Sequence, residues 1–231
     1  MEVHPANGAT PVRDARRPGT TYGAAMTTND SPLTALLLNC TLSPSPAESS
    51  TELLGRQVLD ALAEHGVTGT EVRVVDHDIR PGVDLDMGDG DEWPAIRRQV
   101  MAADILVLAT PIWLGQHSSV AQRVLERLDA ELSETDDEGR LLTFGKVAVV
   151  AVVGNEDGAH HIAAVAFQAL NDVGFTIPTQ GATNWTGEAM QGVDYKDLEE
   201  TPEETASATA TLAANAAHLA RLLRRDGYPA V

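Results

Sequence analysis

The sequence is short of the features that mark disulfide-rich, metal-cluster and membrane-spanning proteins. Cys40 is the one cysteine among its 231 residues, which excludes an intrachain disulfide and a thiolate-rich metal cluster. No apolar run approaches the roughly 18 residues that a membrane-spanning helix needs. We therefore expect a soluble protein, and the cysteine content gives no support to export.

Basic residues are also scarce. Lys and Arg together number 16, against 34 Asp and Glu, which gives a formal net charge of -18. Such a surface repels a nucleic-acid backbone and anionic lipid headgroups, so we expect neither nucleic acid nor a membrane as a partner. Residues 1–31 contain no apolar core of the kind that a secretory signal needs, so we expect a cytoplasmic protein.

The chain divides into a tail and one domain. Residues 1–31 are rich in Gly, Pro, Thr and Ala and show no hydrophobic periodicity, which predicts a flexible tail. Residues 32–231 alternate short apolar runs with amphipathic segments, a pattern typical of a parallel sheet covered by helices. We expect strands at residues 35–40, 71–75, 105–109, 147–153 and 175–178, and helices at residues 50–64, 93–102, 118–132, 159–173 and 202–225.

Right-handed crossovers leave few arrangements for five parallel strands. The order 2-1-3-4-5 is the commonest for a chain of this size, so the predicted fold is a flavodoxin-like α/β sandwich of three layers. In that topology a ligand lies outside the carboxyl ends of the strands. The loops after the first, third and fourth strands are therefore the candidate site.

The first of these loops is rich in hydroxyl groups and leads into the start of a helix. Free N–H groups and the positive helix end attract an anion, and hydroxyls add donors, so the loop suits a phosphate. An ordinary Ser/Pro turn with a serine N-cap is the alternative. The candidate phosphate-binding residues are Thr41, Ser43, Ser45, Ser49, Ser50 and Thr51.

Motifs that the same loop lacks exclude several other classes. It has neither the glycine-rich run ending in Lys and Ser/Thr of a nucleotide triphosphate site nor the three-glycine dinucleotide fingerprint. A phosphatase of this topology needs an Arg six positions after its nucleophilic Cys, where Pro46 stands. A receiver domain needs acidic residues where Asn39 and Thr110 stand.

The second and third loops suit a flat heteroaromatic ring. The second offers an aromatic wall and backbone N–H groups, and the third is small and polar, with glycines that permit close approach. The alternatives are that Trp113 is a half-buried loop residue and that Asn155 or Asp157 is only a helix cap. The candidates are Pro111, Ile112, Trp113, Leu114, Gly115, Gly154, Asn155, Glu156, Asp157, Gly158 and His160, the last as a hydrogen-bond or proton donor near the ring.

Two runs in these loops carry a resemblance to a known family. The Thr-Pro-Ile-Trp-Leu-Gly turn at residues 110–115 and the Gly-Asn-Glu-Asp-Gly-Ala-His run at residues 154–160 resemble those of NAD(P)H-dependent FMN reductases and flavodoxin-like reductases. The resemblance covers roughly residues 33–225. The first loop departs from the family's Gly-Ser-Pro-Arg style because it has no basic residue, which leaves the phosphate to hydroxyls and N–H groups.

The resemblance implies non-covalent FMN, with its phosphate on the first loop and its ring between the second and third. NADH or NADPH would reduce it, and a quinone, another flavin or a similar small molecule would accept the electrons. No side-chain nucleophile or general base is required, because the flavin carries the redox chemistry. The resemblance also implies a homodimer or homotetramer.

Other readings and features stay open. The acidic net charge of the chain favours an electron carrier without a nicotinamide site, since flavodoxins dock on basic partners. A scaffold without cofactor is a third possibility.

The acidic run at residues 84–92 is out of register with a calcium-binding loop, so we expect a solvated loop and no metal site. Residues 181–198 are too long and too aromatic for a simple connector, which predicts a cap over a site or a subunit contact.

Overall fold

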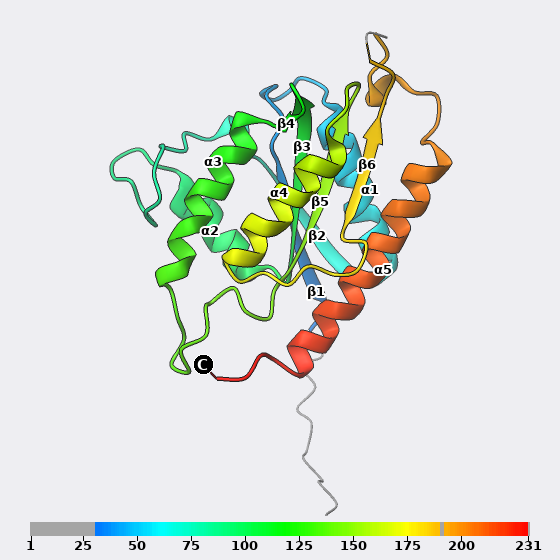
Figure 1. Ribbon diagram of the computed structural model, residues 1–231. Coiled ribbons are helices and arrows are strands. Elements are labelled where there is room, and N and C mark those ends of the chain that lie inside the picture. The colour runs from blue at the N-terminus through cyan, green and yellow to red at the C-terminus, as the bar shows by residue number, and fades with distance from the viewer. Residues whose placement is uncertain (1–30, 190–191, 231) are drawn as a thin grey trace, which may run out of the picture. The chain divides into compact units, whose positions relative to one another are not determined.

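A parallel sheet forms the centre of the computed structural model, which describes residues 31–189 and 192–230. The predicted tail at residues 1–31 lies outside the described residues except for Ser31. The parallel strands run in the order β2-β1-β3-β5-β6 (Figure 1), which confirms the predicted 2-1-3-4-5 order. Their bounds are β1 (Leu33–Asn39), β2 (Val67–Arg73), β3 (Ile105–Trp113), β5 (Val147–Gly154) and β6 (Ala182–Thr186).

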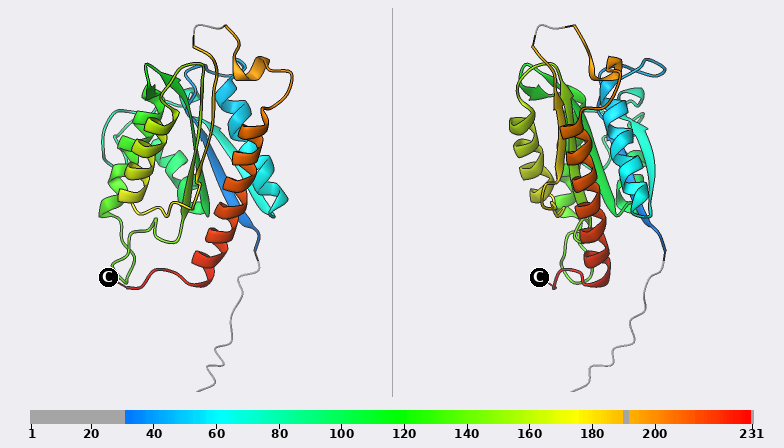
Figure 2. Two further views of the ribbon diagram at one scale, coloured as in Figure 1. Left: turned by 45° about the vertical axis from the view of Figure 1, so that its right-hand side comes forward. Right: turned by 90° about the vertical axis from the view of Figure 1, so that its right-hand side faces the viewer.

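Helices cover both faces of this sheet and complete a three-layer sandwich (Figure 2). One face packs against α1 (Ser50–Glu64) and α5 (Glu203–Arg225). The other packs against α2 (Trp93–Ala102), α3 (Ser119–Leu128) and α4 (Ala159–Asp172). Short 3-10 turns η1 (Val74–Asp76), η2 (Asp129–Ser133) and η3 (Tyr195–Asp197) join the larger elements.

The central strands explain the two cores. In β5 every residue from Val147 to Val153 is buried, as expected for a parallel strand covered on both faces. Val150 and Val152 pack with the helices α2, α3 and α4, whereas Val149 and Ala151 pack with α1 and α5. The period-2 alternation of a strand thus divides one apolar run between two cores.

The predicted fifth strand at residues 175–178 is wrong. Thr176 makes only an isolated parallel bridge to Val147, and the strand beside β5 is β6, which starts at Ala182. Pro178 has no N–H for a ladder, and Gln180 adopts a φ of 53°, so the chain turns before pairing resumes. In β6 the buried Thr183 bonds the Thr209 hydroxyl of α5 at 2.8 Å, so the strand lacks the apolar run that marks the others.

Other boundaries moved less. The predicted strand at residues 71–75 begins earlier, at Val67, and its end is the turn η1. The helix predicted at residues 118–132 ends at Leu128 and continues as η2. A two-residue strand, β4 (Gln116–His117), folds back antiparallel on β3 and was not predicted.

The acidic loop before α2 is anchored by a buried ion pair, so the prediction of a solvated loop is partly wrong. The Arg127 guanidinium donates to the Asp91 carboxylate at 2.9 Å and to the carbonyls of Arg80 and Asp84, and it lies 5.7 Å from the centre of the Trp93 ring. The side chains of Arg127 and Asp91 are both fully buried. Burial acts to raise the pKa of Asp91, but hydrogen bonds from the Met87 N–H and from Arg127 outweigh it and hold that pKa below its usual value.

Replacing Arg127 should destabilise the fold. Arg127→Met leaves the Asp91 carboxylate buried without its cation, so we expect the free energy of unfolding in urea at pH 7 to fall by about 3 kcal/mol. Arg98→Met, on the exposed side of α2, is the matched control and should change it by less than about 0.5 kcal/mol.

The cost of Arg127→Met should depend on pH. The folded pKa of Asp91 is lowered, so the pair's contribution is present above the unfolded value, about 3.9, and declines as pH falls through the folded value. The difference between the wild type and Arg127→Met should therefore shrink in acid. A difference independent of pH would contradict the role of this carboxylate.

Candidate functional site

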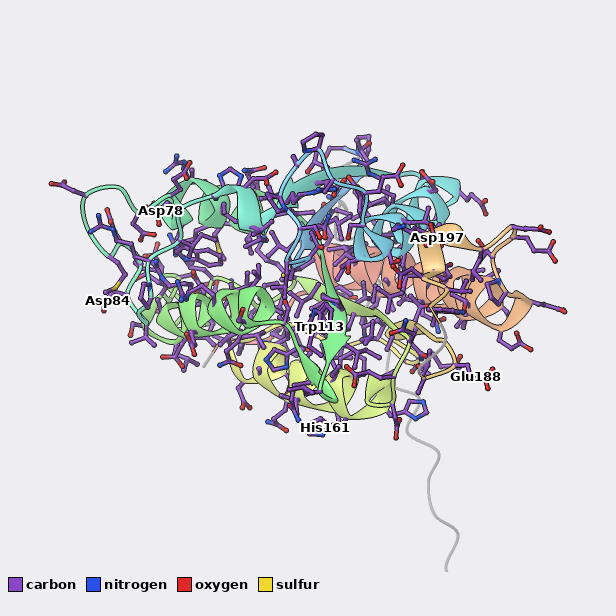
Figure 3. All side chains as sticks on the ribbon, turned by 90° about the horizontal axis from the view of Figure 1, so that it is seen from above. Asp78, Asp84, Trp113, His161, Glu188 and Asp197 are labelled. Carbon is purple, nitrogen blue, oxygen red and sulfur yellow. The ribbon has the colours of Figure 1, made fainter. Side chains whose placement is uncertain are left out.

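A pocket lies at the carboxyl ends of the parallel strands, where the topology predicts a ligand. It holds about 730 Å³ of empty space, part of it open to solvent. Figure 3 looks down on this edge, with Trp113 at the end of β3 and Asp197 on η3. Four segments line the pocket: the three predicted loops and a fourth that contributes Trp185 of β6 and residues 194–196.

The first loop brings hydroxyl groups to the start of α1. Ser49 caps the helix, since its hydroxyl accepts from the Glu52 N–H at 3.3 Å, and its backbone is extended, as an N-cap requires. The predicted residues of this loop that line the pocket are Thr41, Ser43, Ser49, Ser50 and Thr51. The helix start therefore offers the hydroxyls and N–H groups of an anion site.

Ser45 does not line the pocket. Its N–H and hydroxyl donate to the Asp76 carboxylate at 2.9 and 2.5 Å, and these bonds lower the pKa of Asp76. Behind the loop, the Arg73 guanidinium donates to the carbonyls of Ser43 and Ala47 at 3.3 and 2.7 Å. The loop conformation is thus held by a basic residue of β2 that lies far from it in the sequence.

The second loop is a hairpin between β3 and β4. Pro111, Ile112 and Trp113 line the pocket, and the Trp113 residue is 56% exposed. Leu114 and Gly115 lie outside the lining and make the turn, with φ values of 52° and 72°. The Leu114 N–H donates to Glu156 Oε1 at 2.7 Å, which ties this hairpin to the third loop.

The backbone of the third loop lies against the backbone of that hairpin. Gly154, Asn155 and Glu156 line the pocket, whereas Asp157, Gly158 and the exposed His160 do not. A Cβ at Gly158, whose φ is 133°, would lie 2.8 Å from Gly115 Cα. The glycines of both loops therefore set how closely the two loops approach.

The fourth segment was predicted only as a cap, without site residues. Tyr195 is buried, donates its hydroxyl to Gln57 Oε1 at 2.6 Å and packs on Trp185 with ring centroids 5.4 Å apart. The signal in the sequence that could have identified these lining residues was the presence of two aromatic residues in a long connector. The lining residues that sequence reasoning missed are Leu42, Glu48, Val153, Trp185, Asp194, Tyr195 and Lys196.

The residues present fit FMN. One side of the pocket carries hydroxyls at a helix start, which suits a phosphate, and another carries the indole of Trp113, which suits a flat ring. Among residues 31–189 and 192–230, no group of three or more His, Cys, Asp or Glu side chains is placed to hold a metal ion. None of the described helices has both the length and the apolar character needed to cross a membrane.

Comparison with protein families matches residues 34–189 to the NADPH-dependent FMN reductase model. The chain belongs to this family. The match confirms the family that the two loop motifs indicated and, with the relatives below, supports an FMN-dependent oxidoreductase. It extends from β1 through β6 and so includes the three predicted loops.

Two curated relatives cover most of the chain. It is 35% identical over 206 residues to the 8-demethyl-8-aminoriboflavin-5'-phosphate synthase of Streptomyces davaonensis, with 85% of this chain and 80% of that protein aligned. It is 41% identical over 199 residues to the divalent metal cation transporter MntH of Mycobacterium bovis, with 83% of this chain aligned. The chain spans only 29% of the length of that transporter.

Solved structures give the same fold. The crystal structure of RosB with bound 8-demethyl-8-formylriboflavin-5'-phosphate matches with a TM-score of 0.77 and 35% identity, over 85% of this chain and 82% of that one. A flavodoxin from the domain Archaea matches with a TM-score of 0.52 and 8% identity, over 82% and 99% of the two chains. The second match shows the flavodoxin-like fold alone.

Enlarging Gly158 should separate the second and third loops. Gly158→Ala puts a methyl group against the Gly115 backbone at an unfavourable φ, so we expect the free energy of unfolding to fall by more than about 2 kcal/mol. Gly88→Ala is the control, because φ there is 93° but nothing lies within 4 Å of the added Cβ. Equal losses in the two variants, measured in urea, would show that the loop contact contributes nothing beyond backbone strain.

Proposed function

We propose that this chain is an FMN-dependent oxidoreductase that takes electrons from NADH or NADPH and passes them to a quinone, a flavin or a similar small acceptor. The observation that supports it most is the pocket itself, in which a hydroxyl-rich helix start faces an aromatic hairpin within a chain of this family. When bound, FMN supplies the redox chemistry. The protein supplies binding, orientation and exclusion of water.

The residues divide these tasks by position. Ser49, Ser50 and Thr51 would hold the phosphate together with the first N–H groups of α1. Trp113 would cover the ring and keep water from one side of it, and the backbone at Gly154 would approach the ring edge. Glu156 keeps the hairpin in place by accepting the Leu114 N–H.

Flavin binding and Trp113 provide the first test. The purified protein should bind FMN with a shifted absorption spectrum, and Trp113→Ala should weaken the affinity about tenfold through lost aromatic contact. Leu132→Ala is the control, because Leu132 is also exposed and apolar but lies on η2, outside the pocket lining. Absence of FMN binding by the wild type at micromolar FMN would contradict the proposal.

The electron donor needs a separate experiment. Anaerobic NADH or NADPH should bleach the bound flavin, and a quinone should restore its absorbance. If neither nicotinamide bleaches it while a flavoprotein reductase does, the chain is an electron carrier instead. The net charge of -18 favours that candidate, because an acidic surface attracts basic partners.

A second candidate is an enzyme that modifies the flavin itself. The supporting observation is the 35% identity to 8-demethyl-8-aminoriboflavin-5'-phosphate synthase along 85% of this chain. In this case FMN would be the substrate, and the pocket would bind it reversibly. Mass spectrometry of the flavin after incubation with FMN, dioxygen and an amino-group donor decides between the two, since a reductase returns FMN with its mass unchanged.

A further inference from the structure

Positive charge is scarce in the pocket. Among its lining residues within the described chain, Lys196 alone is basic, and Glu48, Asp194 and Glu156 are acidic. Arg73 is close in the fold, but its guanidinium is engaged behind the loop with two carbonyls and with Glu52 at 2.5 Å. An anion that enters this pocket therefore meets one side-chain cation.

The backbone of Lys196 is attached to the start of α1. Its N–H donates to the Ser50 hydroxyl at 3.2 Å, and Ser50 is the first residue of the helix. The preceding residue, Tyr195, is held by Gln57 and Trp185. The lysine side chain thus starts from a fixed point beside the helix end that suits a phosphate.

The ammonium group is charged and only partly buried. Its Nζ lies 2.8 Å from Asp197 Oδ1, and the side chain is 28% exposed. The hydrogen bond to Asp197, together with Asp194 and Glu48, raises the pKa of Lys196. The ammonium group has three donors on a flexible side chain, so its bond to Asp197 leaves donors available for a phosphate oxygen.

We propose that Lys196 binds the phosphate of FMN and makes the pocket selective for phosphorylated flavins over riboflavin. The inference rests on the proposed function in taking FMN as the ligand. Hydroxyl and N–H groups at a helix start carry no full charge, and the nearby carboxylates repel an anion. Lys196 supplies the charge that favours a phosphate there, and it comes from residues 192–198 instead of the loop after β1.

Binding of two flavins to matched variants tests the selectivity. Lys196→Met should weaken FMN about tenfold and leave riboflavin within about twofold, because riboflavin lacks the phosphate. Lys196→Arg should retain most of the FMN affinity, since it keeps the charge. Arg98→Met removes an exposed positive charge from α2, outside the pocket lining, and should leave both affinities unchanged.

The scarcity of lysine allows a direct measurement on the wild type. The sequence contains two lysines, Lys146 and Lys196, so lysine labelled with ¹³C at Cε gives two side-chain signals. Lys146 is the internal reference, because its Nζ donates to the carbonyls of Met101 and Ala103, outside the pocket lining. FMN should shift the Lys196 signal much more than riboflavin does.

The outcomes separate this inference from the proposed function. Two results would overturn the inference while FMN binding itself still stands. One is equal weakening of FMN and riboflavin binding by Lys196→Met. The other is a Lys196 signal that FMN shifts no more than riboflavin does. Failure of the wild-type protein to bind FMN would overturn both. A selective loss of FMN affinity with a phosphate-dependent Lys196 shift supports the inference.

Discussion

The parallel pairing of β1 with β3 is the constraint on which the pocket depends. It brings the two strands to the same edge, where the Cys40 N–H donates to the Ala109 carbonyl at 2.8 Å. Ser118 then joins the following loops, since its hydroxyl donates to the Cys40 carbonyl at 2.7 Å and its N–H donates to the Thr110 hydroxyl at 3.0 Å. These buried hydrogen bonds fix the position of the hydroxyl-rich loop relative to the aromatic hairpin.

The same pairing buries Cys40, so its thiol is unreactive. Its side chain is fully buried between the sheet and the helices α2, α3 and α4, and burial raises the pKa of the thiol. A thiol in that state is a poor nucleophile, because attack requires the thiolate. The physical environment therefore agrees with the missing Arg at position 46 in excluding phosphatase chemistry at Cys40.

Much of the architecture was predictable because apolar runs and helix caps are local signals. The runs at β1, β3 and β5, and the serines that cap α1 and α3, gave the positions of the three loops. The strand order followed from the handedness of crossovers and the commonest topology for such a chain. The strand β6 was missed because its partners lie on α5: the Thr183 hydroxyl bonds that of Thr209, and the Asn184 carbonyl accepts from the Thr205 hydroxyl. No local pattern reveals this partnership. Ser45 was misplaced for the same reason, since its partner Asp76 lies 31 residues away.

Residues 194–196 are a part of the pocket that the sequence did not predict, and they lie outside the sheet. Parallel strands dictate where their own loops meet, but nothing in that geometry brings Tyr195 and Lys196 back over α1. That return depends on the long-range bonds of Tyr195 to Gln57 and of Lys196 to Ser50, across 138 and 146 residues of sequence. A segment held by such contacts can change its charge without disturbing the sheet, so it is the place where one fold can be adapted to a different flavin or acceptor.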